Sequence, residues 1–242
     1  MIDLHTHILP GIDDGARTLD DALEMAQAFV ADGVTTIAAT PHVRDDFPTS
    51  ADVMLHAVDT LRQALHEEGI PLLVLPGAEL AIDWIARLHE ADLRRLTLAG
   101  GGRYILVETP YHGWPAELIE RLLGLRVAEF VPVLAHPERN AHVQQAPSLL
   151  APLVNGGTIV QITAASLDGR LGGPCRRTAL HLVTAGLAHM VTSDAHMPSV
   201  RAAGMRSAAD ALEDAALAEW LTSDVPRALV EARSPPPRPR TG

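Results

Sequence analysis

The chain has 242 residues, of which 47% are apolar, and it carries a formal net charge of −11 at pH 7. A chain of this size can bury one full core, and (β/α) barrels of about 200–250 residues often fold as one domain. The negative charge argues against a nucleic-acid or anionic-membrane partner, because such partners need clustered Lys and Arg.

Short apolar runs alternate with longer amphipathic segments along the chain. The runs lack strict polar alternation, as expected for strands buried on both faces. In chain order the predicted strands are Ile2–Leu4, Thr35–Ala39, Leu72–Leu75, Tyr104–Val107, Phe130–Ala135, Thr158–Ile162 and His189–Thr192. The predicted helices are Asp20–Ala31, Ala51–His66, Pro115–Leu125, Arg176–Ala185 and Ala202–Leu217, and several helices are expected to stop at Gly33, Gly69 and Gly186.

This alternation predicts an α/β protein whose parallel strands are joined by right-handed crossovers. We favour a distorted (β/α)7 barrel forming one domain over residues 1–233, and a doubly wound open sheet is the alternative. Residues 234–242 are rich in proline, so we expect them to form an extended, disordered tail.

Side chains of the types that bind metals follow six of the seven predicted strands. The C-terminal ends of barrel strands point to one rim, where barrel enzymes place their sites. His5 and His7 are two residues apart, so on a strand they face the same side. The other candidates are His42, Glu79, Glu108, His136, Asp194 and His196, and only the sixth strand, ending near Thr163, delivers none.

Asp13-Asp14-Gly15 follows the first of these strands. Alone it has the composition of a turn before a helix, but its position makes one of the two carboxylates a further ligand candidate. Mixed imidazole and carboxylate ligands suit Mn, Fe or Zn. Because nine ligands are too many for one ion, we expect a cluster of two or three, which could activate water and clamp the oxygens of a phosphoryl group.

Arg139 and Arg201 lie shortly after His136 and His196, and a guanidinium fork matches the geometry of a phosphate. Other catalytic chemistries fit the chain poorly. A cysteine phosphatase needs an arginine six residues after its nucleophile, and the residue six after Cys175 is His181. The chain also lacks a Gly-x-x-x-x-Gly-Lys phosphate loop and a Gly-x-Ser-x-Gly elbow.

Cys175 is the single cysteine, so the chain forms no internal disulfide, which fits a reducing compartment. The N-terminus lacks the basic and apolar regions of a secretion signal. No stretch reaches about 18 uninterrupted apolar residues. We therefore expect a cytoplasmic protein without membrane insertion.

The motifs in combination resemble a known superfamily. His5-x-His7, Thr40-Pro-His42, Glu79, His136 and Asp194-x-His196 resemble the polymerase-and-histidinol-phosphatase (PHP) superfamily. Within it, the segment from Ile8 to Ala16, Gly77-Ala-Glu79, Glu108-x-Pro110 and His136-Pro-Glu-Arg139 closely resemble the bacterial capsule-type (CpsB/YwqE-like) protein-tyrosine phosphatases. The resemblance runs from Met1 to about Arg201.

The resemblance implies a distorted (β/α)7 barrel that holds three divalent ions, commonly Mn, with Fe, Zn, Co or Mg as alternatives. The first ion would take His5, His7, Glu79 and Asp194. The second would share Glu79 and take Glu108 and His136, and the third would take Asp14, His42 and His196. Arg139 and Arg201 would bind the phosphate.

The same resemblance implies a mechanism and a substrate. A metal-bound hydroxide would attack phosphorus in line, without a phosphoenzyme, while the metals and arginines stabilise the equatorial oxygens. The substrate would be a phosphotyrosine protein, namely a bacterial tyrosine autokinase that regulates capsule or exopolysaccharide export. Val43, Met197 and Ala202 depart from the family pattern. These departures bear on the shape of the substrate cleft, and none removes a ligand.

Two other functions stay open. One is a small-molecule phosphatase of the same superfamily, such as one for histidinol phosphate, and the other is a non-catalytic metal-binding module. We favour phosphotyrosine partly because the loops after the ligand strands are expected to be short, which would leave the metals in an open depression.

Overall fold

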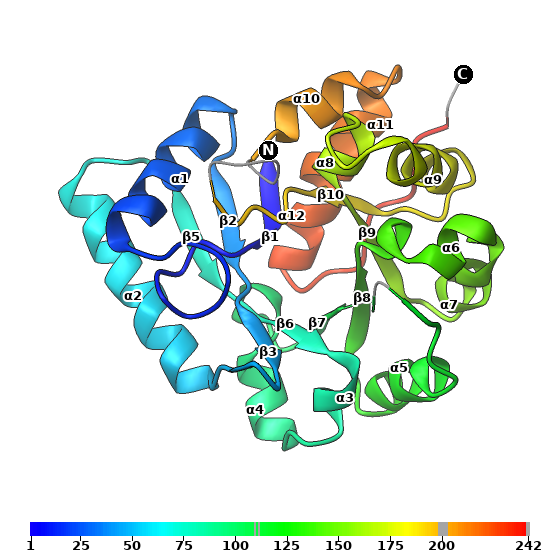
Figure 1. Cartoon of the computed structure of the whole chain (residues 1–242), viewed down its shortest axis with the longest axis horizontal. Coiled ribbons are helices and arrows are strands. Elements are labelled where there is room, and N and C mark those ends of the chain that lie inside the picture. The colour runs from blue at the N-terminus through cyan, green and yellow to red at the C-terminus, as the bar shows by residue number, and fades with distance from the viewer. Residues whose placement is uncertain (109, 111, 198–202, 241–242) are drawn as a thin grey trace.

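The computed structural model describes residues 1–108, 110, 112–197 and 203–240. Strands lie in the middle of the molecule and helices cover them from outside (Figure 1). The strands are β1 (Ile2–Thr6), β2 (Thr36–Ala39), β3 (His42–Arg44), β4 (Phe47–Pro48), β5 (Leu73–Pro76), β6 (Glu79–Ala81), β7 (Tyr104–Glu108), β8 (Val131–Ala135), β9 (Ile159–Thr163) and β10 (Met190–Thr192). All seven predicted strands are therefore confirmed, and the α/β class with them.

Longer helices begin at capped positions. Thr18 caps the first helix in a capping box with Asp21, and the Ser50 side chain caps the second. The α-helices are α1 (Leu19–Ala31), α2 (Ala51–Glu67), α3 (Ile82–Ile85), α4 (Glu90–Arg95), α5 (Leu118–Val127), α6 (Ala141–Gln145), α7 (Ala151–Asn155), α8 (Ala164–Leu167), α9 (Gly173–Thr184), α10 (Met205–Asp210), α11 (Ala215–Glu219) and α12 (Val225–Val230). Short helical turns are η1 (Leu98–Gly100), η2 (Pro137–Arg139), η3 (Pro147–Leu150) and η4 (Trp220–Asp224).

The predicted helix ends hold at three glycines and fail at one long segment. Gly33, Gly69 and Gly186 have φ of 86°, 66° and 72°, so each adopts the left-handed conformation that ends a helix. The single helix predicted over residues 202–217 is wrong. Two helices, α10 and α11, occupy its described part, because the Asp214 side chain accepts a hydrogen bond from the Leu217 N–H and caps a new helix there.

Two of the predicted strands are each broken into two strands that pair in different sheets. One sheet has the order β1-β2-β5, and the other has the order β10-β9-β8-β7-β6-β3-β4. The break between β2 and β3 contains Pro41, which has no N–H to donate. The break between β5 and β6 contains Gly77, where a side chain would lie 3.2 Å from Thr40 Cγ2. The second halves then pair in parallel, with His42 opposite Glu79.

The end of β1 joins the two sheets. The His5 carbonyl accepts a hydrogen bond of 2.9 Å from the Asp194 N–H, and the His7 N–H donates one of 2.9 Å to the Ala195 carbonyl. The buried Asp3 carboxylate also accepts hydrogen bonds from the backbone N–H groups of Ser193 and His5, at 3.1 and 3.3 Å. These bonds place the segment after β10 directly beside β1.

Loop lengths at the C-terminal ends of the strands vary more than expected. Residues 7–18 join β1 to α1, residues 109–117 join β7 to α5, and residues 193–204 join β10 to α10. The expectation of mostly short loops is therefore wrong for these three strands. In contrast, β6, β8 and β9 pass into helical turns within a residue or two.

The proline-rich C-terminal segment is described over residues 234–240 and contains no helix or strand there. Its backbone and side chains bond to the body of the protein. Trp220 Nε1 donates to the Pro236 carbonyl at 3.1 Å, and Arg238 donates to the Val183 carbonyl at 2.7 Å. Its expected disorder stays a prediction. None of the helices in the described part of the chain is long and apolar enough to cross a bilayer.

Candidate metal centre

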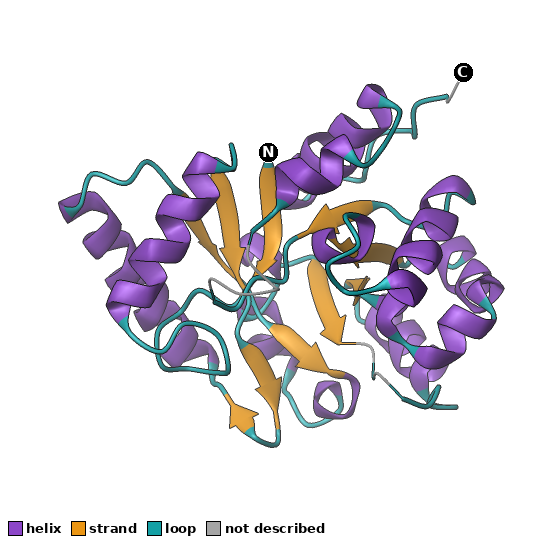
Figure 2. Ribbon diagram, turned by 45° about the horizontal axis from the view of Figure 1, so that its top comes forward, coloured by secondary structure: helices purple, strands orange, loops and turns teal. Residues whose placement is uncertain are grey.

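All nine predicted metal-type side chains lie in the described part of the chain, and they gather at the C-terminal ends of the strands. Figure 2 shows those strands grouped in the middle of the molecule with the helices outside them. The nine side chains form four overlapping groups: His7, Asp14, His42 and His196; His5, Glu79 and His136; His5, His7 and Asp194; and His42, Glu79 and Glu108. Arg201 lies outside the described residues.

Four of these side chains have the spacing of ligands that share one ion. His5 Nε2 lies 3.2 Å from His7 Nε2, 3.3 Å from Glu79 Oε2 and 3.5 Å from Asp194 Oδ1. His7 Nε2 lies 3.4 Å from Glu79 Oε2 and 3.4 Å from Asp194 Oδ1. Ligand atoms about 2.1 Å from one ion at tetrahedral angles lie about 3.4 Å apart. The measured distances match that value.

Glu79 occupies the centre of the cluster. Its side chain is 0% exposed, and its Oε1 lies 2.9 Å from His136 Nε2. Its Oε2 lies 3.0 Å from His42 Nδ1, yet neither of these atoms has a hydrogen-bond partner. Buried polar atoms nearly always find such partners. Two buried donor atoms that face each other without one are suited to share a cation.

Asp14, His42 and His196 form a third region of the cluster, at its open side. Asp14 Oδ1 lies 3.4 Å from His42 Nε2 and 3.2 Å from His196 Nε2, and its side chain is 41% exposed. Asp13 lies beside Asp14 in the sequence but is fully buried and faces His7. The structure therefore separates the two carboxylates that the sequence left open.

The Asp-Asp-Gly segment folds back onto the end of β1. A side chain on Gly15 would lie 1.9 Å from the His7 carbonyl, so only glycine fits there. Ala16 donates to that carbonyl at 3.0 Å. Asp13 Oδ2 lies 2.7 Å from His7 Nδ1 and accepts a hydrogen bond of 3.0 Å from the His42 N–H. Asp13 thus orients two imidazoles of the cluster.

Gln161 is a site residue that the sequence analysis missed. It lies on β9, the strand that was expected to deliver nothing. Its Oε1 lies 3.2 Å from His5 Nδ1 and accepts a hydrogen bond of 3.0 Å from the His136 N–H. Partners of this kind fix the ring orientation and tautomer of ligand histidines. The only signal in the sequence was a polar amide within a buried apolar run.

The pKa values show that imidazoles and carboxylates in the cluster hold each other charged. Burial alone would lower the pKa of His42, but Glu79 and Asp14 outweigh it and raise that pKa to about 9. Burial alone would raise the pKa of Glu79, but His5 and His42 hold it well below its usual value. The cluster thus needs positive charge between its donor atoms, which protons or divalent cations can supply.

Two backbone positions in the cluster are strained. His136 and Asp194 have φ of 36° and 51°, in the left-handed region that non-glycine residues rarely adopt. Such residues cost about 1–3 kcal/mol each and persist where the surroundings hold them. Both follow the C-terminal end of a strand, so the strain turns their side chains into the cluster.

Two arginines contact carboxylates of the cluster. Arg139 forms an ion pair with Asp194, and the Arg139 side chain is 11% exposed. Arg44, which was not predicted as a site residue, donates to Glu108 Oε1 at 3.0 Å. Positive charge is thus present at two points on the edge of the cluster.

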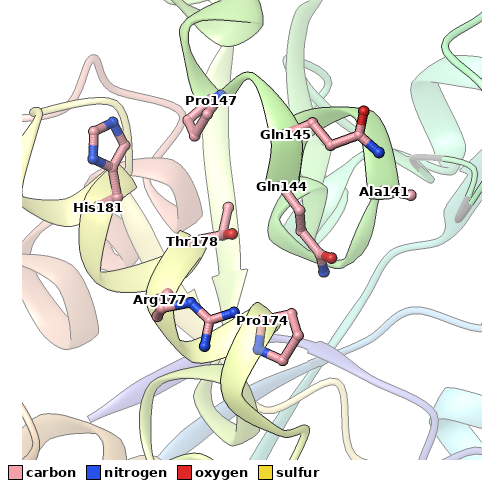
Figure 3. Close-up of a pocket in the computed structure, with 8 residues that line it drawn as sticks. All are labelled: Ala141, Gln144, Gln145, Pro147, Pro174, Arg177, Thr178 and His181. Carbon is pink, nitrogen blue, oxygen red and sulfur yellow. The ribbon is translucent and has the colours of Figure 1, made fainter.

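A separate groove of about 440 Å³ lies between α6 and α9, and Figure 3 shows the side chains that line it. Ala141 and Gln144 line one wall, and Pro174, Arg177 and His181 line the other. None of the nine cluster residues lines this groove. Cys175 is half-buried next to Gln144, and burial raises the pKa of its thiol. That shift disfavours the thiolate a cysteine nucleophile needs.

Comparisons with known proteins place the geometry in context. A family model described as capsular polysaccharide synthesis, CpsB/CapC, matches residues 1–225. A tyrosine-protein phosphatase, YwqE of Bacillus subtilis (strain 168), is 42% identical over 204 residues, which cover 83% of this chain and 79% of that protein.

Two further similarities extend over nearly the whole chain. The tyrosine-protein phosphatase CpsB of Streptococcus pneumoniae is 25% identical over 241 residues, which cover 95% of this chain and 98% of that protein. A crystal structure from a study of YwqE and CpsB, described as unique metal-dependent tyrosine phosphatases, matches with a TM-score of 0.88 and 35% identity. That match covers 100% of both chains.

Proposed function

Because the chain belongs to the CpsB/CapC family of capsular polysaccharide synthesis proteins, we propose that it is a metal-dependent protein-tyrosine phosphatase. The observation that carries the proposal is the spacing of His5, His7, Glu79 and Asp194, whose donor atoms lie 3.2–3.5 Å apart. Similarity to the tyrosine phosphatases supports the substrate class. The family resemblance found in the sequence is thereby confirmed.

We infer three divalent ions, with Mn the first choice and Fe, Zn, Co or Mg as alternatives. The first would be held by His5, His7, Glu79 and Asp194. The second would share Glu79 and use Glu108 and His136, and the third would use Asp14, His42 and His196. The overlap of the four side-chain groups at Glu79 and His42 supports an arrangement in which ions share ligands.

The protein's own residues prepare the reaction. When bound, the ions supply Lewis acidity that lowers the pKa of water and neutralises charge on the phosphate. Gln161 and Asp13 hold the rings of His5 and His7 in place through their Nδ1 atoms. Arg139 and Arg201 are assigned to the phosphate oxygens, where fixed guanidinium groups stabilise charge that develops during transfer. No side-chain nucleophile is required.

We also infer that the strands close into a distorted seven-stranded barrel. If β2–β3 and β5–β6 each count as one strand, every strand pairs with the next around the ring. The hydrogen bonds between the end of β1 and residues 194–195 complete the circuit. A closed ring brings the C-terminal end of every strand to one rim.

The substrate is proposed to be a phosphotyrosine protein, namely a tyrosine autokinase of capsule or exopolysaccharide synthesis, dephosphorylated in the cytoplasm. The cluster is open at Asp14, which is 41% exposed, so a phosphate carried on a protein surface can approach from that side. Histidinol phosphate is the second candidate substrate, since a small ester could reach the same opening.

A kinetic comparison tests the proposal. With Mn-loaded protein, kcat/KM is measured for a phosphotyrosine peptide, a phosphoserine peptide and histidinol phosphate. We expect the phosphotyrosine peptide to be the best substrate. A value at least tenfold higher on histidinol phosphate, a difference of about 1.4 kcal/mol, would overturn the substrate assignment. No turnover of any ester, nor of p-nitrophenyl phosphate, would favour a non-catalytic module.

A further inference from the structure

Phe47 is an aromatic residue that packs against the metal cluster and not against the core. Its ring lies 6.0 Å from the ring of His42, with an angle of 18° between the two planes. The chain has three Phe, and the other two, Phe29 and Phe130, are 1% and 0% exposed in the core. Phe47 is half-buried and does not belong to the hydrophobic core or to the apolar side chains packed on it. Core packing therefore does not account for this aromatic ring.

A groove opens between Phe47 and the loop that carries Asp14. Its volume is about 270 Å³, and its walls include Gly11 and Ile12 from that loop and Phe47 and Pro48 from β4. Ile12 precedes Asp13-Asp14 directly, and Phe47 stacks on His42, so both walls adjoin the cluster. Binding sites for drug-sized ligands span about 300–1,000 Å³, so this groove suits a single ring.

The short hairpin formed by β3 and β4 holds Phe47 in place. The Arg44 guanidinium lies 5.2 Å from the centre of the Phe47 ring and also donates to Glu108. At the turn, Asp45 accepts hydrogen bonds from Trp84 at 3.0 Å and Arg87 at 2.6 Å. The ring is thus fixed next to the cluster before any ligand arrives, which limits the ordering cost of binding.

We propose that Phe47 and Ile12 form the subsite for the phenyl ring of phosphotyrosine and select aryl over alkyl phosphate esters. This inference rests on the proposed function and adds the residues that determine its specificity. A phosphate held at the Asp14 and His42 side of the cluster places its ester group at the mouth of the groove. An aryl group enters between Ile12 and Phe47, whereas a short alkyl stem does not reach them.

The test compares an aryl ester with an alkyl ester in Phe47→Ala. With Mn-loaded protein, kcat/KM is measured for free phosphotyrosine and for β-glycerophosphate, and the ratio of the two is compared with that of the unchanged protein. An aromatic pair contributes enough to change that ratio about threefold to tenfold. We expect a fall of this size, mainly through a higher KM for phosphotyrosine, because a ring contact stabilises ground state and transition state alike.

Control variants separate selection from support of His42. Phe47→Tyr should restore the ratio, and Leu123→Ala, which removes a 54%-exposed apolar side chain from α5, should leave it unchanged. An unchanged ratio in Phe47→Ala overturns the inference. So does an equal loss on both esters accompanied by lost metal, which would show that Phe47 only supports His42. If the unchanged protein hydrolyses neither ester, the proposed function itself fails.

Discussion

Replacing the central carboxylate with an amide should disrupt the metal centre more than any other single conservative change. Glu79→Gln keeps the size of the side chain but removes its charge and one ligand oxygen. Glu79 Oε2 lies 3.0 to 3.4 Å from nitrogens of His5, His7 and His42, and Oε1 lies 2.9 Å from His136. One substitution therefore affects four imidazoles.

The size of the effect follows from burial. Removing one partner of a buried ion pair costs about 3–5 kcal/mol, which corresponds to about a hundredfold to several thousandfold in an equilibrium constant. Glu79 is fully buried, so the whole range applies to it. Asp14 is 41% exposed and contacts only His42 and His196, so Asp14→Asn should cost less and release one ion at most.

Bound metal per chain, measured by elemental analysis after dialysis, tests this contrast together with kcat/KM on p-nitrophenyl phosphate. We expect Glu79→Gln to lose at least two ions and Asp14→Asn one. Glu24→Gln, an exposed substitution on α1, serves as the matched control and should lose none. Equal metal loss and equal rate loss in the Glu79 and Asp14 variants would refute the placement of Glu79 at the centre.

Three further predictions concern the residues around the ligands. Arg139→Lys should lower kcat/KM and weaken inhibition by inorganic phosphate, because lysine keeps the charge but lacks the planar fork; near-normal values would place Arg139 outside the phosphate site. Gln161→Leu should weaken metal binding about 10- to 100-fold, since it removes the acceptor from His5, and a titration that shows unchanged affinity would contradict this. In the metal-free protein the raised pKa of His42, about 9, contributes stability that is complete below about pH 6.5 and is lost as pH rises through 9. The melting temperature of the metal-free protein should therefore fall over this range while the gain on adding Mn grows, and a gain independent of pH would argue against proton displacement by metal.

The strands and their ligand positions could be predicted because the physics is local. Parallel strands buried on both faces are continuous apolar runs, so all seven were found within about two residues of their ends. The side chains that follow such runs then share one rim. His5, His42, Glu79 and His136 were assigned in this way, and the structure brings them together.

What could not be predicted depends on contacts between distant segments. The division of two strands at Pro41 and Gly77 follows from packing against neighbours that the sequence does not reveal. Asp13 and Asp14 are chemically identical, and only the fold of the loop turns one toward His7 and the other toward His196. Gln161 contacts residues more than 20 positions away, so no local pattern marks it.

The central claim is that hydrolysis of phosphotyrosine depends on divalent metal and on no thiol. The most direct measurement is the turnover of a phosphotyrosine peptide by the unchanged protein and by Cys175→Ser, before chelation, after exhaustive chelation and after Mn is restored. We predict that both proteins lose activity on chelation and regain it with Mn to the same level. Full activity in the chelated protein, or an inactive but folded Cys175→Ser variant, would contradict the account.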